Sequence, residues 1–266
     1  MRLVRVLVCA LLVSNFPSLL SAQQAAPVTT PQAFAILQRA LSALNAQQPL
    51  TDITLTASAR RIAGSDDESG TATIKALASG ASRLDLSFAS GNRTEIFNAS
   101  TTPPTGSWSG PDGVVHPMAY HNLLTGPFSF FPAFALAASY SSHATVVTDM
   151  GLETRNGQSV QHVSLSQPSI FPVATGVLSS ASLTRIDLFL DSTTLLPLAI
   201  TFNTHPDNNA LLDIPVEIDF SDYTVVNGAQ VPFHIQKLIN NSLVLDLQLQ
   251  KASLNTGITA AQIIGQ

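Results

Sequence analysis

One pentapeptide has the glycine spacing of the nucleophile elbow of serine hydrolases: Gly106-Ser107-Trp108-Ser109-Gly110. In that elbow the central residue is the serine nucleophile, held on a sharp turn between a strand and a helix. Trp108 occupies the central position here, and the prolines and glycines around it predict an irregular loop. The spacing alone therefore does not predict a serine hydrolase.

Histidines are the next candidates, because they serve both as metal ligands and as general bases. The six histidines are His116, His121, His143, His162, His205 and His234. None of them belongs to a His-Glu-x-x-His motif or to a helical histidine pair with a carboxylate. We expect scattered surface or half-buried histidines, and no metal site.

Two groups of carboxylates complete the candidates for chemistry. Glu217 and Asp219 lie on one side of a predicted strand, opposite Ile218, and paired carboxylates can hydrolyse glycosides. The polar face of a half-buried strand explains the same pattern without catalysis. The run Asp66-Asp67-Glu68 predicts a solvated turn, since a calcium loop would place its ligands at alternate positions. With no glycine-rich phosphate loop either, we expect a protein that needs no cofactor and is not an enzyme.

Residues 1–22 have the pattern of a cleavable signal peptide. Arg2 and Arg5 precede a short apolar run, and small residues end the segment at Ala22. The apolar run is too short to cross the hydrocarbon core of a membrane. The only cysteine, Cys9, lies too early to be the cleavage site of a lipoprotein. We therefore expect a periplasmic or secreted protein that is cleaved near Ala22 and has no cysteine in its mature form.

The composition argues against several classes of partner. The formal net charge is −5, and it becomes −7 when Arg2 and Arg5 leave with the signal peptide. Nucleic-acid affinity comes largely from Lys and Arg on phosphates, so we expect no nucleic-acid partner. We also expect no integral membrane protein, because no apolar stretch has the length of a membrane span. Only 11% of the residues are charged while 45% are hydrophobic, a surplus that either fills a core or lines an apolar cavity.

The periodicity of apolar residues predicts one helix followed by strands. After a polar spacer at 23–30, Thr30 can cap a helix over about 31–46. Its apolar residues recur at helical spacing: Phe34, Leu37, Leu41 and Leu44. From Ile53 onward apolar and polar residues alternate, as they do in strands with one buried face.

The C-terminal half carries the clearest strand signals. Asn156-Gly157 and Asn227-Gly228 each separate two strand patterns, as two-residue hairpin turns do. Between Leu243 and Leu249 every second residue is leucine, which predicts a strand buried on one face. We expect about ten strands, nearly all antiparallel. They form a single β-rich domain at 31–266, with an irregular, Phe-rich insertion at about 99–143.

This layout resembles the LolA-like superfamily of periplasmic lipoprotein carriers. The resemblance is most specific over residues 183–256. There a strand ends at Asp191, before Thr194-Leu195-Leu196-Pro197, and a second strand follows. The segment from Phe220 to Pro232 then contains a tyrosine, a hairpin glycine and a proline, as such proteins do.

The resemblance implies a mainly β fold with a few helices. Its sheet would be curved and antiparallel, an unclosed half-barrel packed on the N-terminal amphipathic helix, with an apolar cavity for acyl chains. No residue is identified with the cavity arginine of that family, although Arg60, Arg61 and Arg83 lie on early predicted strands.

A Phe-rich segment is the predicted cover of this cavity, since four of the 13 phenylalanines lie between 128 and 134. The candidate ligand-binding residues are Phe128, Phe130, Phe131, Phe134 and Leu136. We expect an exported, non-catalytic protein that binds or carries a lipid or other apolar ligand, with a lipid or an acylated protein as partner. The alternative is a structural or protein-interaction module of the cell envelope that has no small-molecule ligand.

Overall fold

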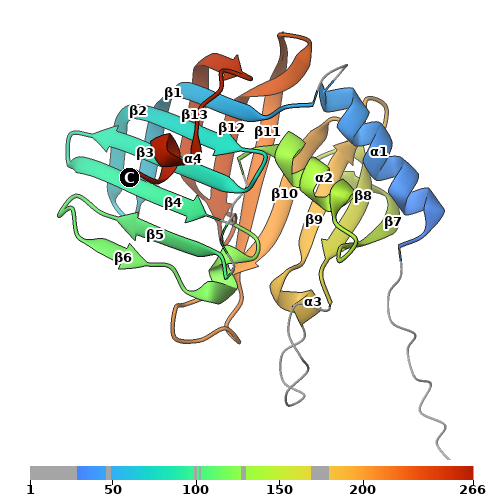
Figure 1. Ribbon diagram of the computed structural model, residues 1–266, viewed down its shortest axis with the longest axis horizontal. Coiled ribbons are helices and arrows are strands. Elements are labelled where there is room, and N and C mark those ends of the chain that lie inside the picture. Colours follow the sequence, from blue (N-terminus) through green and yellow to red (C-terminus); the bar gives the residue numbers. More distant parts are fainter. Residues whose placement is uncertain are drawn as a thin grey trace, which may run out of the picture.

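Thirteen strands form one antiparallel sheet that does not close into a barrel (Figure 1). The structure is a computed structural model that describes residues 29–45, 49–98, 101, 103–126, 130–168 and 180–265. The predicted signal peptide at 1–22, most of the spacer and Phe128 lie outside the described residues. The predicted fold class, a mainly β chain with an unclosed sheet and an N-terminal helix, is confirmed.

The sheet is a meander whose first and last strands pair in its middle. The strands are β1 Asp52–Ala63, β2 Asp66–Leu77, β3 Ala81–Phe88, β4 Gly91–Asn98, β5 Thr105–Ser109, β6 Val115–Pro117, β7 Val146–Arg155, β8 Gln158–Ser166, β9 Ile186–Asp191, β10 Pro197–Thr204, β11 Ile214–Val226, β12 Ala229–Ile239 and β13 Ser242–Leu254. Their order is β6-β5-β4-β3-β2-β1-β13-β12-β11-β10-β9-β8-β7. In Figure 1, β2 to β6 lie on one side of the molecule and β7 to β10 on the other.

The helix α1, Pro31–Asn45, confirms the predicted N-terminal helix. The Thr30 hydroxyl accepts a hydrogen bond of 3.2 Å from the backbone N–H of Ala33, as an N-cap does. The buried stripe consists of Ala33, Ile36, Leu37, Ala40 and Leu44. Phe34, which was predicted on this stripe, lies outside it: the residue is 37% exposed and stacks on Tyr140 of α2, Pro132–Ser141, with ring centroids 4.8 Å apart.

The remaining helices are short: η1 Tyr120–Leu123, α3 Ser180–Leu183 and α4 Ala260–Ile264. The α4 helix packs on β3 and β4, and the carbonyl of its buried Ile263 accepts a bond from Arg83. Of the helices in the described part of the chain, none combines the length and apolar character that crossing a membrane requires.

Both predicted Asn-Gly hairpin turns are confirmed. The φ angles are 51° and 78° at Asn156 and Gly157, and 49° and 87° at Asn227 and Gly228. Positive φ at both central residues defines the turn whose twist matches that of the flanking strands. A third turn, at Asn240-Asn241, uses asparagine at both positions, with φ of 49° and 60°.

The acidic run at residues 66–68 was predicted as a solvated turn, and this is wrong. These residues begin β2, and the turn falls at Gly64, whose φ is 61°. Cross-strand pairing explains the difference, because Asp67 bonds Arg60 at 2.6 Å and Glu68 faces Arg61 on β1.

The segment at 99–143, predicted as irregular, contains regular structure in its described part. Trp108 lies in β5 and pairs with Glu95 of β4, and β6 adds a further edge strand. Helix α2 begins at Pro132, where proline fits the first turn of a helix. Alternation over only five and three residues is too short to separate these strands from loops by sequence.

The concave face of the sheet carries the core, and its two ends differ. Along β1, Ile53 and Leu55 are buried, and the last residues on this face are Arg61 and Ala63. Near the start of β1 and β12, helices α1 and α2 pack on the sheet, and we call this region the covered end. The far ends of the same strands, around Arg61 and Lys237, form the open end.

Candidate functional site

A cavity of about 580 Å³ lies at the open end of the concave face. Strands β1, β3, β4, β5, β12 and β13 supply its walls, and none of its lining residues belongs to a helix. Its apolar surface comes mainly from Leu84, Leu86, Ile239, Val244 and Leu245. Its charged lining residues are Arg61, Arg93, Glu95 and Lys237. The cavity therefore combines an apolar surface with a small group of ionisable side chains.

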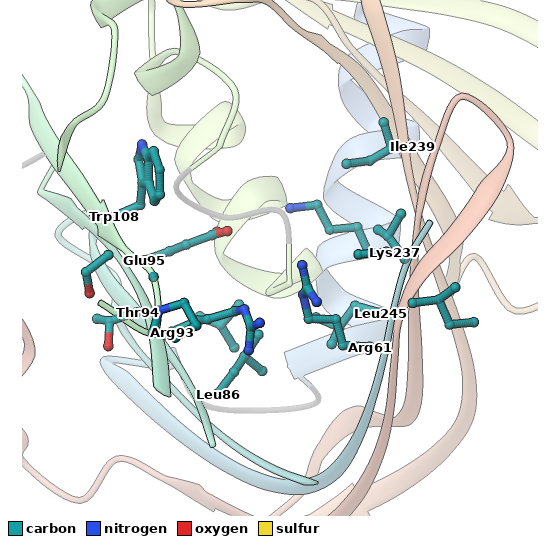
Figure 2. Close-up of a pocket in the computed structure, with 16 residues that line it drawn as sticks. Arg61, Leu86, Arg93, Thr94, Glu95, Trp108, Lys237, Ile239 and Leu245 are labelled. Atoms are coloured by element: carbon teal, nitrogen blue, oxygen red, sulfur yellow. The ribbon is translucent and has the colours of Figure 1, made fainter. Parts of the chain in front are cut away.

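Strand register places two of the cations on either side of one leucine. Leu245 of β13 is the Cα partner of Arg61 on β1 and of Lys237 on β12. Residues paired across antiparallel strands share a face of the sheet, so all three side chains project from the concave face. Figure 2 shows the charged ends of Arg61 and Lys237 directed into the cavity.

A single carboxylate faces both cavity arginines. Glu68 lies 3.4 Å from Arg61 and 3.6 Å from Arg93, and it also accepts a short hydrogen bond from the Ser90 hydroxyl. That hydrogen bond, and then the two guanidinium groups, lower the pKa of Glu68 below its ordinary value. Two positive charges therefore share one negative charge at this wall of the cavity.

Lys237 and Glu95 come from opposite walls and form no ion pair with one another or with other described residues. The Lys237 ammonium lies 5.9 Å from the ring centroid of Phe130, within the range of a cation–π contact. Figure 2 shows Glu95 pointing from β4 toward the space into which Lys237 and Arg93 also point. Ionisable groups of both signs thus meet in one partly apolar space.

Trp108 forms part of the rim of the cavity. Its indole is 42% exposed and stacks on the His116 ring of β6, with centroids 4.4 Å apart. The pentapeptide around Trp108 lies in β5, so the strand–turn–helix context of a nucleophile elbow is not formed there.

The predicted Phe-rich residues lie at the covered end. Phe130, Phe131, Phe134 and Leu136 are buried in the main core, and Phe128 lies outside the described residues. The three described phenylalanines line a cavity of only about 20 Å³, together with residues that include Ile53 and Val231. Only Phe130 approaches the larger cavity, through its contact with Lys237.

The predicted carboxylate pair lies on the convex face of β11. Arg155 forms an ion pair with Glu217, and Asp219 shares a hydrogen bond with Glu217. Burial, and then the neighbouring Glu217, raise the pKa of Asp219 to about 7. Burial opposes the ionisation of Glu217, but the hydrogen bonds from Arg155 and Asp219, together with the positive charge of Arg155, outweigh it and lower the pKa of Glu217. Glycosidase carboxyl groups lie about 5 Å or more apart, so this hydrogen-bonded pair does not fit glycoside hydrolysis.

None of the described histidines lines the cavity. His162, His205 and His234 bond Asp187, Asp213 and Asp246 at 3.1, 3.0 and 2.9 Å respectively. Within the described ranges, no group of three or more His, Cys, Asp or Glu residues could hold a metal ion.

The residues of the larger cavity were not assigned from the sequence, although a signal for them exists. Arg61 continues the alternation of Ile53, Leu55, Ala57 and Ala59 on β1, and Lys237 continues that of Ile235 on β12. A charged residue on the apolar side of a strand is uncommon unless it faces a cavity or a partner. This rule singles out both cations without a structure.

The fold and the cavity define a class of protein architecture: an unclosed antiparallel half-barrel with helices on its concave face, the LolA-like fold. Among solved structures, the chain is similar to a putative outer membrane lipoprotein-sorting protein domain from Vibrio parahaemolyticus, with 15% identity and a TM-score of 0.53. The alignment covers 86% of this chain and 94% of the other. The resemblance drawn from the sequence is therefore confirmed for the fold.

Two further solved structures share this fold. A LolA superfamily protein from Nitrosomonas europaea is 11% identical with a TM-score of 0.53, over 87% of this chain and 96% of its own. A DUF1329 family protein from Desulfovibrio piger is 10% identical with a TM-score of 0.52, over 89% and 97%. At these identities the likeness establishes the fold alone. No protein-family model and no curated protein sequence matches the chain.

Proposed function

We propose that this protein binds a lipid, or another apolar or acylated ligand, in the cavity at the open end. The observation that carries the proposal is the cavity itself, about 580 Å³ with leucine, isoleucine and valine side chains on its walls. Ligand sites commonly have volumes of roughly 300–1,000 Å³, with mostly apolar walls and a few polar groups. A sheet whose concave face were filled by its own side chains would leave no such space.

The partner in this proposal is a lipid or an acylated protein, and the location is the periplasm or the exterior of the cell. The location rests on the signal-peptide pattern of residues 1–22. A similar solved structure is a putative outer membrane lipoprotein-sorting protein domain, which is compatible with both expectations.

The binding role does not include catalysis. The ionisable groups that line the cavity are two arginines, one lysine and one glutamate. The cavity lining, as far as the described residues supply it, contains no histidine and no cysteine that could act as base or nucleophile. Electrostatic contact with a ligand is the chemistry that these groups support.

The buried phenylalanines close the inner end of the cavity in this proposal. Phe130 contacts Lys237, while Phe131, Phe134 and Leu136 hold α2 on the sheet behind it.

The test is uptake of the neutral apolar fluorophore N-phenylnaphthylamine by delipidated protein. Ala63 lines the cavity at the end of β1, so Ala63→Trp fills the space without removing any core side chain. Ser58 is exposed on the opposite face of the same strand, which makes Ser58→Trp the matched control. We expect uptake by the wild type and by Ser58→Trp, and loss of uptake in Ala63→Trp. Equal uptake by both variants, or no uptake by the wild type, would contradict the proposal.

One observation favours the alternative function, a protein-interaction module. The edge strand β7 exposes Met150 by 52% and Leu152 by 69%, and its outer edge has no neighbouring strand in the described sheet. Exposed sheet edges can accept a strand from a partner. Capture of a partner that is lost in Met150→Lys and Leu152→Lys, together with no uptake of any apolar probe, would favour this function.

A further inference from the structure

We propose that the ligand is an anionic amphiphile, with its carboxylate or phosphate between Arg61 and Lys237 and its apolar chain on the leucines of the open end. This inference rests on the proposed function and specifies the chemistry of the ligand. It is carried by the juxtaposition of Arg61, Leu245 and Lys237 in register on three adjacent strands.

The geometry suits one acid group. Arg61 and Lys237 lie two strands apart, which puts their Cα atoms roughly 10 Å from one another. Their side chains are long, and Figure 2 shows the guanidinium and the ammonium directed into the same space. A carboxylate or phosphate placed between them can accept bonds from both, while Leu245 below contacts the first carbons of the chain.

Arg61 lacks a close anionic partner. Arg61 and Arg93 share Glu68 at 3.4 and 3.6 Å, beyond the roughly 2.7–2.9 Å of a strong charge-assisted bond. Arg93 also donates to the Ser90 hydroxyl at 3.1 Å and lies over the Phe88 ring, whereas Arg61 has Glu68 as its ion-pair partner among the described residues. Arginines outside the cavity have closer partners: Arg60–Asp67 at 2.6 Å, Arg83–Asp85 at 2.6 Å and Arg185–Asp187 at 2.8 Å. A second anion at the cavity would complete the pairing that Glu68 provides only in part.

Lys237 is half-buried, with apolar neighbours on the adjacent strands. Its Cα partners on the adjacent strands are Ile218 and Leu245, and its ammonium approaches the ring of Phe130. No acidic side chain of the described residues forms an ion pair with it. A ligand that fills the cavity would remove water from this cation, so an anionic ligand gains more from this position than a neutral one.

Glu95 fixes the side on which the acid group binds. It projects from β4 on the opposite wall, so it repels an anion toward Arg61 and Lys237. The chain as a whole has a net charge of −5, whereas the cavity lining contains three cations and one carboxylate. The charges of the cavity therefore favour an anionic headgroup, and its apolar walls favour a hydrocarbon chain.

The experiment compares cis-parinaric acid with its methyl ester, which differ only in the charge of the headgroup. We expect the wild type to bind the acid about tenfold more tightly than the ester, the effect of one hydrogen-bonded charge pair. Lys237→Met should lower affinity for the acid by about the same factor, so that the acid loses its advantage over the ester. Lys237→Arg, which keeps the charge, should preserve binding of the acid.

Glu95→Gln is the matched control, because it removes the opposite charge from the same cavity. It should tighten binding of the acid, whereas damage to the fold would weaken binding in both variants. Displacement by a lysophosphatidic acid and by a saturated fatty acid then identifies phosphate or carboxylate as the preferred headgroup, and preference for either supports the inference.

Three outcomes would overturn the inference. If the wild type binds the acid and the ester with equal affinity, the charge of the headgroup has no role, although the proposed function still stands. This comparison requires only the wild-type protein. If the wild type bound lysophosphatidylethanolamine more tightly than lysophosphatidic acid, and Glu95→Gln abolished this preference, the ligand would be zwitterionic. If neither parinaric probe nor N-phenylnaphthylamine binds, the proposed function fails together with the inference.

Discussion

The covered end and the open end belong to the same strands but differ in what fills the concave face. At the covered end, α2 places Phe131 and Phe134 on the start of β1 and β12, and about 20 Å³ of space remains. At the open end, no helix contributes to the lining and the cavity measures about 580 Å³. The sheet is continuous between the two, so the strands themselves do not decide which end is hollow.

Helix cover and inward-facing charge account for the difference. Aromatic side chains from α2 fill the volume that the curvature of the sheet leaves at one end. At the other end Arg61 and Lys237 occupy positions where the alternation would put apolar residues, and charged groups there resist dry packing. One curved sheet therefore supports a packed core and an open cavity side by side.

The largest expected effect is at the covered end. Phe134→Ala should lower the free energy of unfolding by about 3–5 kcal/mol, because it removes a buried ring from the main core and leaves a cavity. Phe34→Ala, on the exposed side of α1, should cost far less. Urea unfolding followed by circular dichroism measures both. A Phe134→Ala protein that keeps its stability but changes probe binding would make the covered end part of the ligand site.

The next effect lies between the two ends, on β13. Leu247 is fully buried and Gln248 is exposed, as the alternation predicted. Leu247→Ala should cost about 2–5 kcal/mol, the usual range for a core leucine. Gln248→Ala should stay within about 0.5 kcal/mol, as ordinary surface positions do. Similar losses at both positions in thermal and urea unfolding would mean that the convex face of β13 is also packed.

A smaller loss of stability is expected at the open end. Leu86 lines the cavity, so one side of its side chain already lacks packed neighbours. Leu86→Ala should therefore cost only about 1–2 kcal/mol, below the range for a fully packed leucine. The same substitution should weaken uptake of a neutral apolar probe, since it removes wall surface. A loss as large as that of Leu247→Ala would show that the wall of the cavity is as tightly packed as the core.

The smallest expected effect is on the convex face, where the titration of Asp219 should change stability without changing ligand binding at the open end. The pKa of Asp219 is raised from 3.8 to about 7, so between these values the folded chain holds a proton that the unfolded chain has lost. Stability due to this group is therefore present at low pH and decreases as pH rises toward 7. Asp219→Asn keeps a donor for Glu217 and should be more stable than the wild type at pH 8, by on the order of 1 kcal/mol after allowing for solvent screening.

At pH 4 the two proteins should have nearly equal stability, and probe binding should be the same at both pH values. Urea titrations at the two pH values measure this difference. A change of probe affinity in Asp219→Asn would connect the convex face to the cavity and remove the contrast between them.

The sequence predicts the framework better than the site. Long, regular patterns identified α1, the two Asn-Gly hairpins and the buried leucines of β13 correctly, because each pattern has a single structural solution. Short strands were missed at β5 and β6, since pairing with β4 and not local preference forms them.

The cavity depends on contacts that no local pattern contains. The Phe-rich segment was predicted as its cover because its apolar density is visible in the sequence, yet its ligand role stays a prediction. Arg61, Arg93 and Lys237 meet only because β1, β4 and β12 are brought together by the sheet. A search of each predicted strand for a charged residue on its apolar side would have identified Arg61 and Lys237.

The pairing of β1 with β13 makes the start and the end of the sheet interdependent. Ile53 pairs with Leu254, and the Asp52 carboxylate accepts backbone bonds from Thr256 and Gly257. A chain still being synthesised lacks β13, so it has neither Leu245 nor the connection between β1 and β12 that encloses the cavity. Closing a loop of roughly 200 residues is entropically costly and slow relative to forming the local hairpins. The cavity at the open end therefore requires the C-terminal strands, and we expect it to form late in folding.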